Sequence, residues 1–149
     1  MKTWLLTWNV DRWFWDDTLN GYKELICDIE QEGHTFCKWT CGNNKSIKKG
    51  DRIFLIKLGA LPRGIVASGF AATDVFEGTH WDTEKRKEGK KARRIFVDFD
   101  KIKDYEIDNI LEYEQLTTIS KCFQWSTQSS GIQIPENIAK QIEKYWKSV

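Results

Sequence analysis

A nearly continuous apolar run lies near the middle of this 149-residue sequence: Arg52-Ile53-Phe54-Leu55-Ile56-Lys57-Leu58. Apolar residues without alternation, in a run of strand length, predict a central β-strand buried on both faces. A turn through Gly59–Arg63 follows, and Gly64–Thr73 predicts a second strand rich in small residues. Small side chains on a strand allow close approach, either by a packed helix or by a ligand. The centre of the fold is therefore predicted to be a β-sheet.

Strands and helices are predicted on both sides of this centre. Strand-like composition marks Thr3–Trp8, Thr35–Cys41 and Arg94–Asp100, and in the last of these Ile95, Val97 and Phe99 share one face. Helical spacing predicts helices at Gly21–Gln31, ended by Gly33, at Asp108–Leu116, and at Pro135–Trp146, with Ile138, Ile142, Tyr145 and Trp146 as its apolar stripe. A long connection is predicted for Val75–Lys91. This order predicts one α+β domain over residues 1–149, a curved, mostly antiparallel sheet or small barrel flanked by helices.

Composition places the chain among soluble globular proteins, with 40% hydrophobic and 30% charged residues. No apolar run approaches the roughly 18 residues that span a membrane, and the N-terminus is too short and polar for a secretory signal. We therefore expect a cytoplasmic protein. Cys37 and Cys41 are four residues apart, so a zinc site would have to recruit Cys27, Cys122 or a histidine; the alternative is four reduced, packed cysteines. We expect no metal and no cofactor.

A polar segment lies late in the chain: Phe123-Gln124-Trp125-Ser126-Thr127-Gln128-Ser129-Ser130-Gly131. Five adjacent polar residues are untypical of a core strand, but their short side chains can hydrogen-bond the edge of a heterocycle. A neighbouring tryptophan offers a flat face for stacking. The segment is predicted to form one wall of a pocket for a flat polar ligand such as a base; the alternative is a capped turn before the last helix.

Positive charge gathers in one stretch although the net charge is only +1. Between Glu84 and Arg94, seven basic residues stand against two acids: Lys85, Arg86, Lys87, Lys90, Lys91, Arg93 and Arg94. Such a stretch is a candidate for contact with phosphates, and its alternative is a solvated hairpin loop.

Several of these pieces resemble one known family. The chain resembles the EVE domains of the PUA-like superfamily, which also includes YTH and ASCH domains. The matching pieces run in family order: Trp4–Asn9 with Asp11–Asp17, Trp39–Gly42, Ile47–Ile56, Pro62–Ile65 with Ala67–Gly69, His80–Asp82 and Trp125–Ile132. The chain is most similar to the EVE-type domain at the N-terminus of some bacterial HNH restriction endonucleases that attack modified DNA, although no HNH-like segment follows.

This resemblance implies a twisted five- to six-stranded β-barrel flanked by helices, and a flipped modified base held in an aromatic cage. The base is a methylated or hydroxymethylated cytosine, or a methylated adenine, and the partner is modified double-stranded DNA, with an attached or separate nuclease. The base-binding candidates are Trp8, Asn9, Trp13, Trp15, Trp39, Thr40, Trp125, Gln128, Ser129 and Ser130. The phosphate-contacting candidates are Lys85, Arg86, Lys87, Lys90, Lys91 and Arg93.

Other interpretations of these residues stay open. Trp8 and Asn9 could be a core tryptophan and a turn residue, and either Trp13 or Trp15 could face the pocket. His34 and His80 lie in no recognisable catalytic or metal motif, so the expected role is a binding module rather than an enzyme. The alternatives are a small hydrolase acting on a modified nucleoside, as in some ASCH proteins, and an RNA-binding module.

Overall fold

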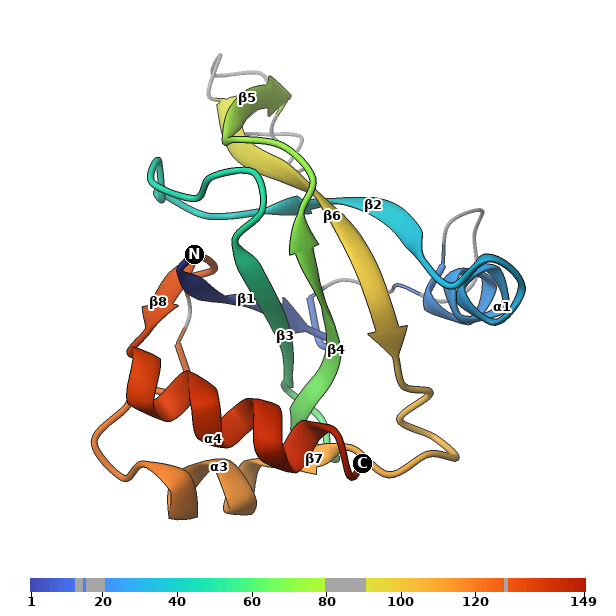
Figure 1. The fold of residues 1–149 in the computed structure, drawn as a ribbon, viewed down its shortest axis with the longest axis vertical. Helices are drawn as coiled ribbons and strands as arrows, with labels where there is room; N and C mark the ends of the chain where they lie inside the picture. The colour runs from blue at the N-terminus through green and yellow to red at the C-terminus, as the bar shows by residue number, and fades with distance from the viewer. Residues whose placement is uncertain (13–14, 16–20, 80–90, 128) are drawn as a thin grey trace.

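The computed structural model describes residues 1–12, 15, 21–79, 91–127 and 129–149, and Figure 1 shows their arrangement. The predicted residues Trp13, Gln128, Lys85, Arg86, Lys87 and Lys90 lie outside this set, as does the side chain of Lys91. The strands are β1 (Thr3–Asn9), β2 (Thr35–Thr40), β3 (Arg52–Leu58), β4 (Gly64–Ala71), β5 (Phe76–Thr79), β6 (Lys91–Ile102), β7 (Leu111–Glu112) and β8 (Ile132–Ile134). The helices are α1 (Tyr22–Glu32), α3 (Tyr113–Ile119) and α4 (Glu136–Trp146).

The strands form one mixed, mostly antiparallel sheet, in the order β2-β6-β4-β3-β1-β8. β1 and β3 run parallel, whereas the other pairs are antiparallel. The predicted central strand is confirmed, since every residue of β3 is buried. The alternation predicted for β6 is also confirmed, because Ile95, Val97 and Phe99 are fully buried.

The sheet curls around one core and carries a second core on its outside. The inner core holds residues such as Leu6, Ile53 and Val97, and α1 packs against it through Tyr22 and Leu25. The outer core lies beneath α3 and α4, which Figure 1 shows together on one side of the sheet. We call the surface of the sheet that turns away from the inner core its outer face.

A seam between β1 and β2 closes the curl, and Ser130 bridges it. The Ser130 hydroxyl accepts the N–H of Thr7 at 3.1 Å and donates to the carbonyl of Thr40 at 2.8 Å. The Trp39 indole N–H donates to the carbonyl of Thr7 at 3.1 Å. The predicted barrel is therefore closed at this seam by side chains.

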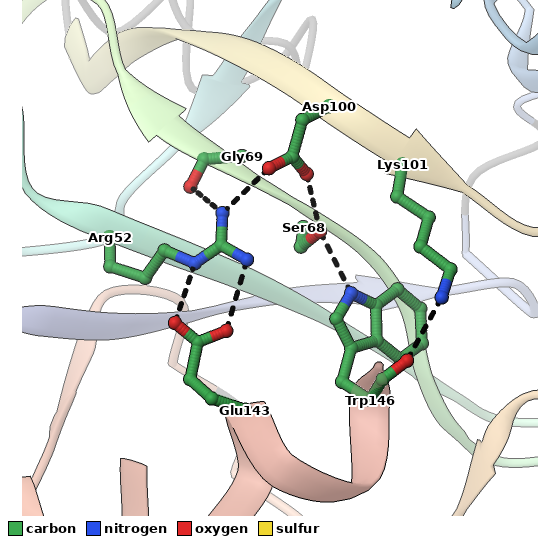
Figure 2. Close-up of polar contacts among 7 residues, drawn as sticks. All are labelled: Arg52, Ser68, Gly69, Asp100, Lys101, Glu143 and Trp146. Carbon is green, nitrogen blue, oxygen red and sulfur yellow. Dashed lines mark hydrogen bonds and ion pairs between the residues drawn. The ribbon is translucent and has the colours of Figure 1, made fainter. Parts of the chain in front are cut away.

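A polar network ties α4 to the outer face (Figure 2). Arg52 of β3 donates two hydrogen bonds to Glu143, at 3.1 and 3.2 Å, one to Asp100 at 2.9 Å and one to the carbonyl of Gly69 at 3.2 Å. The indole N–H of Trp146 donates to the Ser68 hydroxyl at 2.9 Å. These contacts fix the last helix over one half of the outer face.

Four sequence predictions need correction. The connection predicted for Val75–Lys91 contains β5, which pairs with an extended β6. The helix predicted for Asp108–Leu116 is displaced, because Leu111 and Glu112 pair with β4 before α3 begins. Tyr145 is 44% exposed and Ala139 is buried in its place on α4. Thr35–Cys41 and Gly64–Thr73 each end earlier than predicted.

The remaining helix predictions are confirmed. Gly33 ends α1 in the left-handed conformation, with φ of 86°, and its N–H donates to the carbonyl of Ile29 at 2.7 Å. None of the helices in the described part of the chain is long and apolar enough to cross a membrane.

Candidate functional site

A pocket of about 320 Å³ opens where the parallel strands β1 and β3 end. This volume is close to the lower limit of small-ligand sites, about 300 Å³. The pocket is lined by Thr7, Asn9, Asp11, Arg12, Leu58, Gly59, Arg63, Ser126 and Thr127. It therefore joins the end of β1 to the polar segment that was singled out in the sequence.

The strands explain why these groups converge. Asn9 and Leu58 are register partners at the ends of β1 and β3. Side chains alternate along a strand, so Thr7 and Asn9 point to the same outer face as Leu5, which belongs to the outer core. The wall opposite is formed by Ser126 and Thr127, just after Trp125 of the same core.

Short hydrogen bonds hold the loops at the mouth. The side-chain oxygen of Asn9 accepts the N–H of Asp11 at 3.0 Å, and Asp11 accepts the N–H of Ala60 at 3.3 Å. Gly59 has φ of 87°, and a Cβ there would come within 2.7 Å of the Asn9 side-chain oxygen. Arg63 donates to the carbonyl of Gly59 at 2.9 Å. Glycine is required here both by its conformation and by this close approach.

Lys57 holds the loop between β3 and β4 in place through the backbone carbonyls of that loop. Its ammonium donates to the carbonyls of Ala60 and Pro62 at 2.6 and 2.7 Å and lies 4.5 Å from the centre of the Tyr105 ring. Burial lowers the pKa of Lys57 from its ordinary value, and the negative charge of Asp11 opposes that shift. Lys57 thus organises the mouth of the pocket.

Thr7, one of the residues that line the pocket, has a hydroxyl group without a hydrogen-bond partner among the described residues. The oxygen atom of this hydroxyl is buried. An unsatisfied buried hydroxyl costs free energy, on the order of 1–3 kcal/mol. A ligand that reached Thr7 could remove that cost by hydrogen bonding to it.

The predicted tryptophans fall into two separate cores. Trp8, Trp15 and Trp39 meet edge to face inside the barrel, with ring centres 5.4 Å apart for Trp8 and Trp15 and 4.6 Å apart for Trp15 and Trp39. Each is at most 3% exposed. Trp125 lies in the outer core, where its indole N–H donates to the carbonyl of Ser120 at 3.0 Å. In this conformation their ring faces are packed against protein.

The polar candidates take different positions. Asn9 lines the pocket, whereas Ser130 bridges the seam. The N–H of Ser129 donates to the Thr127 hydroxyl at 3.1 Å. Thr40 donates at 3.5 Å to the carbonyl of Arg93, a predicted phosphate-contacting residue of the basic stretch that lies in β6. Asn9 and the polar segment are thus brought together, and the tryptophans are held elsewhere.

Outside the polar segment, sequence reasoning missed six pocket residues: Thr7, Asp11, Arg12, Leu58, Gly59 and Arg63. The sequence pattern indicates an ordinary strand residue at Thr7 and a turn residue at Arg63. One signal was available, because Asp11 and Arg12 directly follow Asn9. Nothing in the sequence alone places Arg63 beside them.

The cysteines are free and form no metal site in the described part of the chain, where no group of three or more potential ligands occurs. Burial raises the pKa of the Cys37 and Cys41 thiols to about 11 each. At neutral pH both are thiols, which are poor nucleophiles.

Comparison with known proteins identifies the fold. No known family model matches the sequence, and neither does any curated protein. Among solved structures, human THYN1 in complex with DNA containing 5-methylcytosine superposes with a TM-score of 0.67 at 11% identity, covering 99% of this chain and 98% of that one. The fold is PUA-like.

Two further structures share this PUA-like fold. A hypothetical protein from Leishmania major has a TM-score of 0.66 at 13% identity, over 99% of this chain and 96% of that one. A Pseudomonas syringae protein has a TM-score of 0.65 at 15% identity, over 96% and 98%. The predicted α+β architecture is thereby confirmed.

Proposed function

We propose that this chain is a nucleic-acid-binding module that holds a flipped, modified base in the pocket beside Asn9. The carrying observation is the convergence of Asn9, Ser126 and Thr127 on one cavity that Thr7 also lines, and the buried hydroxyl of Thr7 has no hydrogen-bond partner among the described residues. THYN1, which shares the PUA-like fold, was solved with DNA containing 5-methylcytosine, and this supports the ligand class.

The chemistry of the pocket fits a nucleotide with an exocyclic amino group. The carboxylate of Asp11 can accept from such a group, as acidic side chains accept from the cytosine amino group. Arg12 and Arg63 stand at the mouth, where guanidinium groups can hold a phosphate with paired hydrogen bonds. Cytosine and adenine carry the amino group, so their modified forms are the proposed ligands.

The polar pocket is preferred to the tryptophan cluster as the base site. Trp8, Trp15 and Trp39 would have to separate before a base could enter between them, whereas the pocket is already open. Extruding a base from a duplex costs a few kcal/mol. A preformed pocket adds no further rearrangement to that cost. We propose modified double-stranded DNA as the polymer, with a nuclease as a partner or attached domain.

Binding to matched oligonucleotides tests this function. The panel contains plain, 5-methylcytosine, 5-hydroxymethylcytosine and N6-methyladenine duplexes at one stated salt concentration. We expect one modified duplex to bind more tightly than the plain one. Asn9→Ala and Thr7→Val should each weaken that preference by about 5-fold or more, since a base-edge contact contributes roughly 1–3 kcal/mol.

Glu136→Gln is the matched control, because Glu136 is 86% exposed on α4 and far from the pocket lining. Equal binding of all duplexes by the wild type would contradict the proposal. If both pocket variants keep the wild-type preference for the modified duplex, the base site lies elsewhere on the protein. Release of a free base or nucleoside from the oligonucleotide would point instead to the hydrolase.

A further inference from the structure

Three phenylalanine rings stand exposed on adjacent strands of the outer face. Phe36 of β2 is 54% exposed, Phe96 of β6 is 39% exposed and Phe70 of β4 is 38% exposed. Isolated apolar residues are common on protein surfaces, but a contiguous aromatic group on an open sheet marks an interaction site. None of these rings lines the pocket, and in the strand order β2, β6 and β4 lie on the side of β3 away from β1.

The strand register shows that the rings belong to one surface. Phe36 and Phe70 are both register partners of Asp98, one on each side of β6. Phe96 lies two residues before Asp98 on β6, and therefore on the same face. With strands about 4.8 Å apart and a rise of about 3.4 Å per residue, the three Cα atoms lie roughly 7–10 Å from one another. We call Phe36, Phe70 and Phe96 the aromatic platform.

Positive charge flanks the platform at the end toward β5. Lys38 is exposed and is the register partner of Phe96, and Arg94 lies two residues before Phe96 on β6. Phe76 of β5 stacks on Phe96, with ring centres 5.7 Å apart and an interplanar angle of 26°. Lys91, Arg93 and Arg94, the end of the basic stretch, belong to β6 itself. The strand that carries Phe96 therefore also carries positive charge.

A carboxylate lies among the rings as well, because Asp98 stands between Phe36 and Phe70 in the strand register. Asp98 contacts the His34 ring nitrogen at 2.8 Å, and His34 packs edge-on against Phe36. Arg52 covers the border with α4, lying 4.7 Å from the centre of the Phe70 ring. Asp100 in turn is bound by Arg52 and Ser68. The carboxylates next to the rings therefore have partners within the protein.

We propose that the aromatic platform binds unpaired bases of single-stranded nucleic acid, at a site separate from the pocket. Exposed aromatic rings on neighbouring antiparallel strands can stack successive unpaired bases, while lysine and arginine beside them hold the phosphates. Stacking of this kind is tolerant of sequence, because every base has a flat face. Lys38, which is exposed, supplies the phosphate contact. The site needs no modified base and does not depend on the proposed function of the pocket.

Fluorescence anisotropy with unmodified, labelled dT12 and rU12 tests the platform, and the two strands separate DNA from RNA. A plain duplex of the same length is the reference. We expect either single strand to bind more tightly than the duplex. Phe36→Ala and Phe96→Ala should each weaken binding by about 5-fold or more. Phe96→Trp should restore binding and show quenching of the new indole by the bound base.

Matched control variants separate stacking on the rings from attraction by charge alone. Ile107→Ala removes an apolar side chain that is 82% exposed, more than any of the three rings, and should leave binding unchanged. Binding that responds to Lys38→Gln but not to loss of either ring would overturn the proposal, since charge would then be sufficient for binding. Failure to bind either strand at low salt would overturn it as well. So would self-association that disappears in Phe36→Ala, because the occupant would then be a second copy of this chain.

Discussion

The two halves of the outer face differ in what covers them. Under α4, Phe54 is fully buried and meets Trp146 edge to face, with ring centres 6.4 Å apart. Beyond Arg52, the rings of Phe70 and Phe96 lie on the same face but stand open to solvent. The strands differ in composition as well, since β3 is mostly apolar on both faces whereas β6 carries Asp98 and Asp100 on the face of Phe96. The boundary between core and surface therefore follows both the sequence of the strands and the position of the last helix. The following predictions test that boundary.

The largest effect is expected in the covered half. Phe54→Ala removes a fully buried ring from the outer core. Loss of the buried surface and the cavity left behind should lower the free energy of unfolding by about 3–5 kcal/mol. Urea denaturation followed by tryptophan fluorescence measures this. A loss below about 1 kcal/mol would mean that α4 does not seal this half.

A smaller effect is expected at the boundary. Glu143→Gln weakens the paired hydrogen bonds to Arg52, whose side chain is 9% exposed. Because Glu143 is itself 39% exposed, solvent screens part of the interaction, and we expect a loss of about 1–2 kcal/mol. Glu136→Gln on the same helix should cost less than about 0.5 kcal/mol, since that ion pair with Lys140 is exposed. Equal losses in the two variants would show that the Arg52 network contributes no more to stability than an exposed ion pair does.

The half of the outer face that α4 does not cover should tolerate substitution with little loss of stability. Phe96→Ala removes a ring that stacks on Phe76 but remains 39% exposed. Cross-strand pairs of this kind contribute about 0.2–1 kcal/mol, so the free energy of unfolding should fall by no more than about 1 kcal/mol. Thermal unfolding of Phe96→Ala beside Phe54→Ala makes the comparison directly. A large loss in Phe96→Ala would place this ring in a core.

The smallest effect concerns pH at the end of α4. Lys101 donates to the carbonyls of Trp146 and Val149, both at 2.9 Å. Burial lowers its pKa from the ordinary lysine value, with Lys103 adding to the shift and Asp100 opposing it. Between the lowered pKa and about 10.4, the unfolded chain holds the proton more tightly than the folded one, so this lysine's contribution to stability rises with pH. In Lys101→Met that rise should become smaller on the alkaline side of the unfolding profile, and Lys57, whose pKa burial also lowers, should supply what remains. A rise of unchanged size would assign it to groups other than Lys101.

Local pattern was sufficient for most of the sheet. The apolar run of β3 and the alternation of Ile95, Val97 and Phe99 encode burial directly, because each residue's environment repeats with the strand period. The helix after Asp108 was misplaced because pairing of Leu111 with β4 overrides local helical spacing. Tyr145 was assigned to the apolar stripe, but the helix turns Ala139, Ile142 and Trp146 inward instead.

The candidate site was harder to predict because its members are distant in sequence. Asn9 and two residues of the polar segment, Ser126 and Thr127, line one cavity, and their role there stays a prediction. Thr7 and Arg63 join them only through the parallel pairing of β1 and β3. Tryptophan abundance was a poor guide to position. Trp125 is a core residue with one polar atom: its ring is buried, and its indole N–H donates to a backbone carbonyl.

Hydrogen exchange at the backbone N–H of Thr7 reports opening of the seam that Ser130 bridges. Most strand amides are protected from hydrogen exchange by backbone ladders, whereas the N–H of Thr7 is held by a single side-chain oxygen. Its exchange rate therefore follows separation of β1 from β2 rather than unravelling of the sheet. Because Ser130 ends the segment that begins at Ser126 on the pocket wall, occupation of the pocket should slow exchange at this one amide before any other.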